Sequence, residues 1–251
     1  MKRFGWTFLA FVGGWTVLAL AIGEGILPTP WAVAQDLWRR LGQVSFYQHL
    51  GVSFWRATAG FFLGLVLAIP LGWLMGGLKK VDDYLAPLLF LTYPVPKILF
   101  LPVLIVSLGL GEAPKIVLVA VTVGYQALVI IRDSVVNLDR SYGEAFAAMW
   151  PTHRSLAAKV LAKTRHVLWP ACLPAVATAT RLTSGTAVSV LFMAESFATD
   201  MGLGFIIMDA WGNLDLPRMF SGIVAMGLLG GFYYNLAKGL EKKLCPWVKA
   251  R

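Results

Sequence analysis

Residues Thr58 to Leu78 read TAGFFLGLVLAIPLGWLMGGL, a run without a single charged side chain. A helix needs roughly 20 mainly apolar residues to cross the hydrocarbon core of a bilayer, so this run is long enough to span one. The whole chain has the same character, since 58% of its 251 residues are hydrophobic and 14% are charged. Soluble domains are typically about 45–50% apolar and about 25% charged. The sequence therefore predicts a membrane protein.

Five further runs reach or approach the length of a membrane-spanning helix. They comprise residues 4–22, 86–108, 116–131, 170–194 and 220–236. The run at 86–108 is interrupted by Pro94, Pro96, Lys97 and Pro102. We therefore expect an all-α, polytopic fold with about six transmembrane helices, which places both termini on the same side of the membrane.

The lysines and arginines are distributed unevenly between these runs. Fifteen lie in one alternate set of connecting segments, five lie in the opposite set, and Lys97 and Arg181 lie inside runs, which accounts for all 22. Because cytoplasmic loops retain positive charge during insertion, we expect both termini in the cytoplasm. This placement explains the net charge of +9 better than a nucleic-acid-binding face does. Lys97 is then close enough to the cytoplasmic end of its run to snorkel, and a contact with a transported solute is the alternative.

The first run has a second interpretation, as part of a signal peptide. Lys2 and Arg3 precede an apolar stretch, and the small residues at 32–34 resemble a cleavage site. The apolar stretch is long, however, and Pro28 and Pro30 separate it from that site. We therefore expect the first helix to be retained.

Residues 31–56, between the first two runs, mix aromatic and basic side chains. Amphipathic rings are enriched at the level of the lipid headgroups, where helices can lie in the plane of the interface. We expect helices along the external surface here.

Three pairs of glycines stand four residues apart in apolar runs. They are Gly60 and Gly64, Gly72 and Gly76, and Gly227 and Gly231. Such pairs let neighbouring membrane helices approach closely. General packing within the bundle and a specific dimer contact both fit, and the former is the more common use.

The cysteines and histidines do not form a recognisable site. Cys172 and Cys245 are far apart in the sequence, and His49, His153 and His166 are scattered. We expect neither a disulfide framework nor a metal site.

The longest polar stretch, residues 132–169, begins with a helix signal. Ser141 and Glu144 stand at the spacing of a capping box, in which a serine caps a helix and a glutamate three residues later bonds back. This predicts a helix from Tyr142 to Trp150.

A second helix is predicted in the same stretch. Pro151 can end or kink the first helix, and Thr152 is suited to cap a second one that reaches about Leu168. That helix is basic and amphipathic. It could rest on anionic lipid, or it could dock into a groove on a partner protein.

Several stretches resemble the binding-protein-dependent ABC importer permeases. Their cytoplasmic loop has a Glu-Ala-Ala start and a paired-proline return to the membrane, and the corresponding stretches here are Glu144-Ala145-Phe146-Ala147-Ala148 and Trp169-Pro170-Ala171-Cys172-Leu173-Pro174. Phe146 stands where the family pattern usually has alanine. The segments that resemble the nitrate, sulfonate and taurine branch of this family are Leu27-Pro28-Thr29-Pro30, the run 60–72, and Ala194-Glu195 followed by Gly202-Leu203-Gly204.

This resemblance covers residues 27–247 and implies the fold of a type I ABC importer permease. The chain is then a single transmembrane domain over 1–251. Its parts are an N-terminal span with an external interfacial helix (1–50), a core bundle (51–237) that contains the cytoplasmic loop (132–169), and a basic cytoplasmic tail (238–251).

The resemblance also implies that the cytoplasmic loop couples the chain to separate ATPase subunits. The residues expected in this contact are Glu144, Ala145, Ala148, Trp150, Thr152, His153 and Arg154. Glu144 could instead serve only as a helix cap.

No catalytic site is expected in this chain. A phosphate-cradling Gly-x-x-x-x-Gly-Lys-Ser/Thr loop is absent from it. We expect no cofactor on the chain itself, with ATP and Mg bound by the partner ATPase. The expected partners are a second permease copy or homologue, two ATP-binding cassette subunits, an external solute-binding protein and membrane lipid.

Charged residues inside a membrane are costly and tend to face a cavity or a partner. Arg181 could face the translocation path and attract an anionic solute, or it could form a structural pair. Glu195 could line an external gate, or it could be a plain interfacial carboxylate or an internal partner for a neighbouring donor. Phe192, Phe205 and Met208 complete the expected path or gate, with Phe205 and Met208 on a half-inserted gate helix.

Taken together, the sequence predicts the permease subunit of an ATP-driven importer in the bacterial inner membrane. Its solute is expected to be small, and Arg181 favours an anion. Nitrate, sulfonates, taurine, bicarbonate and vitamin precursors are all compatible with this branch. An ATP-independent channel or secondary transporter is the alternative. An intramembrane enzyme is disfavoured because no histidine lies in a predicted span to activate Ser184 or Ser189.

Overall fold

The computed structural model describes residues 2–23, 25–149, 162 and 164–247. Every regular element in this part of the chain is a helix, as expected. In chain order the elements are α1 (Lys2–Ile22), α2 (Pro30–Leu41), α3 (Val44–Gly77), α4 (Lys79–Thr92), η1 (Lys97–Phe100), α5 (Leu101–Leu108), α6 (Glu112–Val136), α7 (Arg140–Met149), the π-helical turn η2 (Thr164–Leu168), α9 (Trp169–Glu195), α10 (Leu203–Gly212) and α11 (Leu216–Leu244).

The helix of the second predicted span starts much earlier than expected. α3 runs without interruption for 34 residues from Val44, with Pro70 inside it. At 1.5 Å per residue it is about 50 Å long, which exceeds the roughly 30 Å hydrocarbon core. Residues 44–56 therefore belong to the same helix as the predicted span and do not form a separate helix, and the excess length means that one end of α3 extends beyond the hydrocarbon core. α2 does form a separate helix, and the Thr29 side chain accepts a hydrogen bond from the Ala32 N–H at its start.

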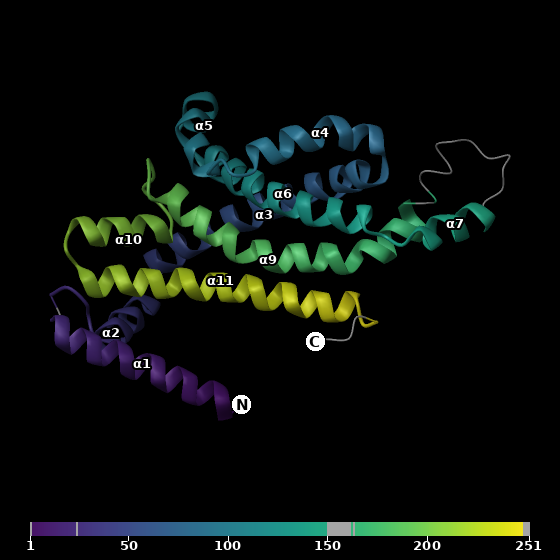
Figure 1. Cartoon of the computed structure of the whole chain (residues 1–251). Coiled ribbons are helices and arrows are strands. Elements are labelled where there is room, and N and C mark those ends of the chain that lie inside the picture. The colour runs from purple at the N-terminus through teal and green to yellow at the C-terminus, as the bar shows by residue number, and fades with distance from the viewer. Residues whose placement is uncertain (1, 24, 150–161, 163, 248–251) are drawn as a thin grey trace.

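The third predicted span is broken in the middle. α4 and the segment formed by η1 and α5 are bent by 91° relative to each other. Pro94 and Pro96 lie in the break, and proline has no N–H to continue a helical hydrogen-bond ladder. In Figure 1, α4 runs along the bundle and α5 turns away from its direction.

Glycines allow α3 and α6 to pack closely. A Cβ added at Gly60 would lie 2.7 Å from Val119 Cβ, and one added at Gly76 would lie 2.5 Å from Val135 Cβ. Gly64 and Gly72 also face α6. Two of the three predicted glycine pairs thus serve packing within this chain. Gly227 and Gly231 of the third pair have no atom within 4 Å of an added Cβ.

α9 lies between α6 and α11 (Figure 1). Four described helices, α1, α3, α6 and α11, are long and apolar enough to cross a membrane, and the bent pair adds a fifth candidate. α9 has 27 residues but does not reach the same apolarity. A helix that buries much of its surface against neighbours presents less of it to lipid, so it tolerates the hydroxyl groups of Thr183 and Ser184, which are buried.

The bundle has two distinct ends. α7 and the last turns of α11 lie toward one end, and α10 and α2 lie toward the other (Figure 1). We call these the cytoplasmic end and the external end, after the predicted orientation.

Candidate functional site

A buried ion pair joins α3 to the end of α9 at the external end. The Arg56 Nη1 atom lies 2.9 Å from Glu195 Oε1, and both side chains are almost completely buried. Arg56 also donates from Nε and Nη2 to the carboxylate of Glu112, the first residue of α6, over 2.5 and 2.6 Å. Its Nη1 donates in addition to the Met201 carbonyl over 2.6 Å. One guanidinium therefore ties three long helices and the loop before α10 together.

Glu195 holds the start of α10 as well. The Gly204 N–H donates to Glu195 Oε2 over 2.9 Å, and the Ser53 hydroxyl lies 2.8 and 2.9 Å from the two carboxylate oxygens. Ser53 Oγ in turn accepts a hydrogen bond from the Leu203 N–H over 2.8 Å. A buried charge is costly without partners, and here the carboxylate has hydrogen-bond donors on both oxygens.

Glycine is required where α10 meets this carboxylate. Gly202 has a positive φ of 123°, a backbone region that favours glycine, and a Cβ there would collide with the Glu195 carboxylate. A Cβ at Gly204 would lie 2.5 Å from Glu195 Cβ. The sequence Gly202-Leu203-Gly204 thus lets the backbone approach Glu195 closely enough for hydrogen bonding.

Three further side chains complete this region. The Gly202 N–H donates to His49 Nδ1 over 3.1 Å, and the His49 ring stacks on Phe205 with 5.7 Å between the ring centroids. Lys115 on α6 is only 5% exposed, and its ammonium donates to the Gly111 carbonyl. We call Ser53, Arg56, Glu112, Glu195 and the N-terminus of α10 the external cluster.

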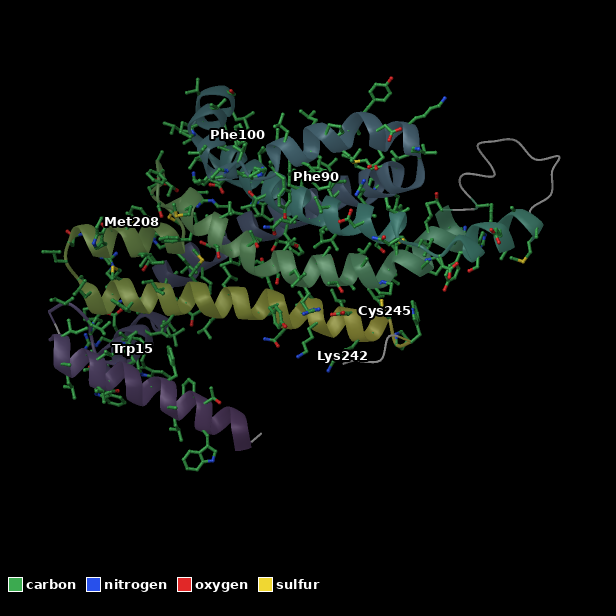
Figure 2. All side chains as sticks on the ribbon, in the orientation of Figure 1. Trp15, Phe90, Phe100, Met208, Lys242 and Cys245 are labelled. Atoms are coloured by element: carbon green, nitrogen blue, oxygen red, sulfur yellow. The ribbon has the colours of Figure 1, made fainter. Side chains whose placement is uncertain are left out.

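The predicted gate residues divide between this cluster and its surroundings. Glu195 is at its centre, and Phe205 contacts His49 beside it. Phe192 is partly buried and packs against the main core. Met208 is half-buried on α10, and Figure 2 shows it at the end of the molecule opposite to Cys245.

Arg181 lies far from the external cluster. It is 14 residues before Glu195 on the same helix, which corresponds to about 21 Å. Its Nε lies 2.9 Å from Glu241 Oε2 on α11, and both side chains are about one quarter exposed. The sequence left two roles open for Arg181, a charge in the translocation path and a structural pair, and the structure contains the pair.

At the cytoplasmic end, α7 presents the first of the predicted coupling residues. Glu144, Ala145 and Ala148 are exposed, whereas Phe146 is buried in a small cluster with Ala162 and Val167. Phe146 therefore attaches α7 to the rest of the chain and leaves the other face free. The remaining predicted coupling residues, Trp150, Thr152, His153 and Arg154, lie outside the described residues.

The predicted helix start in this region is displaced. α7 begins at Arg140 instead of Tyr142, and the Ser141 N–H donates to Asp139 Oδ1 over 2.8 Å. Asp139 rather than Ser141 is the side chain that accepts at the helix start, and this bond lowers the pKa of its carboxyl group. Of the second predicted helix, the described residues 164–168 form the π-helical turn η2 that leads directly into α9.

Arg56 was not recognised as part of a site from the sequence. Its partners Glu112 and Glu195 are 56 and 139 residues away in the chain, so no local pattern connects them. The available signal was that isolated charges of opposite sign, Arg56 and Glu195, both stand at the predicted external ends of spans.

These features define a polytopic, all-helical membrane protein with a charged cluster that holds a short helix at one end and an exposed cytoplasmic helix at the other. Residues 60–244 match the family model described as binding-protein-dependent transport system inner membrane component. The chain belongs to this family of ABC importer permeases and is a multi-pass protein of the bacterial inner membrane, which confirms the resemblance found in the sequence.

Similar proteins agree along almost the whole length. A "probable ABC transporter permease protein" of Brucella melitensis is 30% identical over 96% of this chain and 95% of its own. The taurine transport system permease protein of Escherichia coli K12 is 29% identical over 93% of this chain and 84% of its own. Among solved structures, the inward-facing MetNI methionine ABC transporter matches with a TM-score of 0.68 at 19% identity, covering 80% of this chain and 97% of the matched one. The last match shows the same fold.

Proposed function

We propose that this chain forms part of the translocation path of an ATP-driven importer for a small organosulfonate of the taurine type. The observation that carries the proposal is the similarity to the taurine permease over 93% of this chain, within a family defined by binding-protein-dependent transport. The sulfonate group is an anion, which agrees with the solute charge expected from the sequence.

Energy is proposed to enter through α7. The exposed Glu144, Ala145 and Ala148 form the face that contacts a separate ATPase subunit, while Phe146 holds the helix to Ala162 and Val167. ATP and Mg are bound by that ATPase, and this chain binds no cofactor.

The structure offers a continuous mechanical connection from this face to the external end. η2 joins α9 without a break, and α9 extends over 27 residues, or about 40 Å. Its last residue, Glu195, holds the N-terminus of α10 by a hydrogen bond to Gly204. A displacement of α9 at its cytoplasmic end is therefore transmitted to α10, which we propose as the external gate together with Phe192, Phe205 and Met208.

The complete importer is proposed to contain two permease subunits, two ATPase subunits and an external solute-binding protein. The translocation path runs between the two permeases. Arg181 is proposed to be one of the residues that influence passage of the solute along this path. The binding protein delivers the solute, and closure of the ATPases moves the bundle toward its outward-facing state.

The decisive test is uptake by the reconstituted assembly. The chain is purified with the ATPase and solute-binding protein encoded beside its gene and placed in proteoliposomes, and entry of radiolabelled taurine is measured. We expect uptake that requires ATP at the ATPase side and binding protein at the other side, and that excess methanesulfonate reduces. Uptake that persists without nucleotide would support a channel or secondary transporter and contradict the proposal, and ATP-driven uptake of an unrelated solute alone would contradict the organosulfonate assignment.

A further inference from the structure

The break between α4 and α5 leaves backbone carbonyls without helical partners. Pro94 and Pro96 in the break have no N–H, and the 91° bend separates the ends of the two helices. Unpaired carbonyl groups are costly inside a membrane, where water cannot replace the lost hydrogen bonds. The Thr92 carbonyl retains a turn hydrogen bond from the Val95 N–H over 3.2 Å, so its second acceptor site and the other carbonyls of the break are the ones that need another donor.

Lys97 supplies these donors from within the break. Its Nζ atom lies 2.6 Å from the Thr92 carbonyl oxygen, 3.2 Å from that of Tyr93 and 3.0 Å from that of Val95. The ammonium also lies 4.3 Å from the centroid of the Tyr125 ring, which is within cation–π range. We call the three carbonyl oxygens and this ring face the carbonyl cage.

The carbonyl cage has the composition of a site for a monovalent cation. Unwound backbone carbonyls and the C-terminal ends of broken helices coordinate such ions in transporters, and a ring of carbonyls replaces the hydration shell of K⁺ in channels. The position of the carbonyl cage also favours a cation, because α4 ends at Thr92 and the C-terminus of a helix attracts positive charge. The Tyr125 ring is held in place by a 3.1 Å hydrogen bond between its hydroxyl and Thr92 Oγ1.

We propose that the Lys97 ammonium is a tethered cation that permanently fills the carbonyl cage and fixes the bend between α4 and α5. A lysine ammonium has three N–H donors, and here three carbonyls accept from it. No donor remains for a solute, so Lys97 acts as a positioning residue and not as a contact for the transported anion. Nor does its ammonium reach toward the membrane surface, as the sequence had suggested, since it turns back to the chain instead.

The bend that Lys97 fixes is connected to the external cluster. Leu101 at the start of α5 is in one buried cluster with Leu118 of α6 and Ala194 of α9, and Ile98 packs against it. Ala194 directly precedes Glu195, which holds α10. A fixed bend therefore supports the position of the proposed gate, and this consequence for transport rests on the proposed function.

The carbonyl cage itself can be tested without solute or ATPase. Lys97→Ala removes the tethered ammonium and leaves the cage open to a free cation. We expect the purified variant to unfold at a lower temperature than the wild type in N-methyl-D-glucamine chloride. Replacing that salt by KCl or NH₄Cl at equal ionic strength should raise its unfolding midpoint by about 2–4 °C, while the wild type stays unchanged. Lys80→Ala, which removes an exposed lysine of α4, is the matched control and should show neither effect.

Two further variants make the outcome decisive. Lys97→Ala combined with Tyr125→Leu should lose the response to K⁺ and ammonium, because the ring face is gone. Lys97→Arg keeps the charge but brings a planar group that does not match the carbonyl cage, so we expect it to unfold at a lower temperature than the wild type. The proposal is overturned if Lys97→Arg unfolds like the wild type, or if Lys97→Ala responds to these cations no more than Lys80→Ala does. Because the readout is unfolding, such a failure would leave the proposed transport function untouched.

Discussion

Arg56 and Glu195 form an ion pair in which the two side chains are 1% and 0% exposed, although 139 residues separate them in the chain. Arg56 is additionally bonded to Glu112, whose side chain is about half exposed. Glu195, Arg56 and Glu112 therefore form a row of three charged side chains, buried at Glu195 and exposed at Glu112. The position of the ion pair explains how the end of α9 and the start of α10 are held in one arrangement.

The first prediction concerns the carboxylate in this pair. Glu195→Gln keeps the shape of the side chain but removes the charge that faces Arg56 and the acceptor that faces Ser53 or Gly204. We expect a loss of about 1–3 kcal/mol in the free energy of unfolding, since a buried donor is left unsatisfied. The measurement is the thermal unfolding of the detergent-purified protein, followed by tryptophan fluorescence. Asp200→Asn, at an exposed carboxylate five residues further on, is the control, and equal behaviour of the two variants would refute the role of the pair.

The second prediction concerns the close approach of α10 to Glu195. Gly204→Ala adds a Cβ that would lie 2.5 Å from Glu195 Cβ, so α10 must shift. Overpacking of this kind costs about 1–3 kcal/mol, and we expect uptake by the assembled importer to fall severalfold as the gate is displaced. Gly212→Ala, at the other end of the same helix, meets no atom within 4 Å and should transport like the wild type. Full uptake by Gly204→Ala at normal protein levels would show that the position of α10 is not critical.

The sequence predicted the elements of this fold better than their contacts. Apolar runs such as 58–78 and 116–131 are local properties, and α6 contains the second run and α3 all of the first except Leu78. The start of α3 was missed because the aromatic and basic residues of 44–56 have the composition of an interfacial helix, whereas their packing, such as the stacking of Phe54 on Tyr233 of α11, is tertiary information.

The site was only partly predictable for a related reason. Glu195 was recognised because a carboxylate at the end of a span is conspicuous, and one of its three proposed roles was that of an internal partner. Its partners Arg56 and Ser53 depend on how α3 and α9 pack, which is tertiary information. Lys97 was expected to snorkel because of its position along the predicted span. The break at Pro94 and Pro96 instead turns the chain and brings carbonyl groups to the Lys97 ammonium.

The third prediction separates the two roles of Arg181. Its pair with Glu241 is about one quarter exposed, and pairs of this kind contribute only about 0.2–1 kcal/mol to stability. We expect Arg181→Glu to reduce uptake by misaligning α9 and α11, and the double variant Arg181→Glu with Glu241→Arg to recover most of it. Uptake rates of the two single variants and the double variant form the cycle that measures the coupling. If the double variant remains as inactive as Arg181→Glu, Arg181 acts on the solute as a positive charge in the path.

The fourth prediction addresses the exposed face of α7. Glu144→Lys reverses a charge on a side chain that is exposed, next to the buried Phe146 that holds the helix. Because the change leaves that anchor intact, we expect normal amounts of protein in the membrane, with solute-stimulated ATP hydrolysis by the assembly reduced to near its basal rate. Asp83→Lys makes the same change in charge at an exposed position near the start of α4, and it should leave the stimulation unchanged. Unaltered stimulation in Glu144→Lys would place the ATPase contact elsewhere in the cytoplasmic segment, whereas equal losses in both variants would point to a general effect of surface charge.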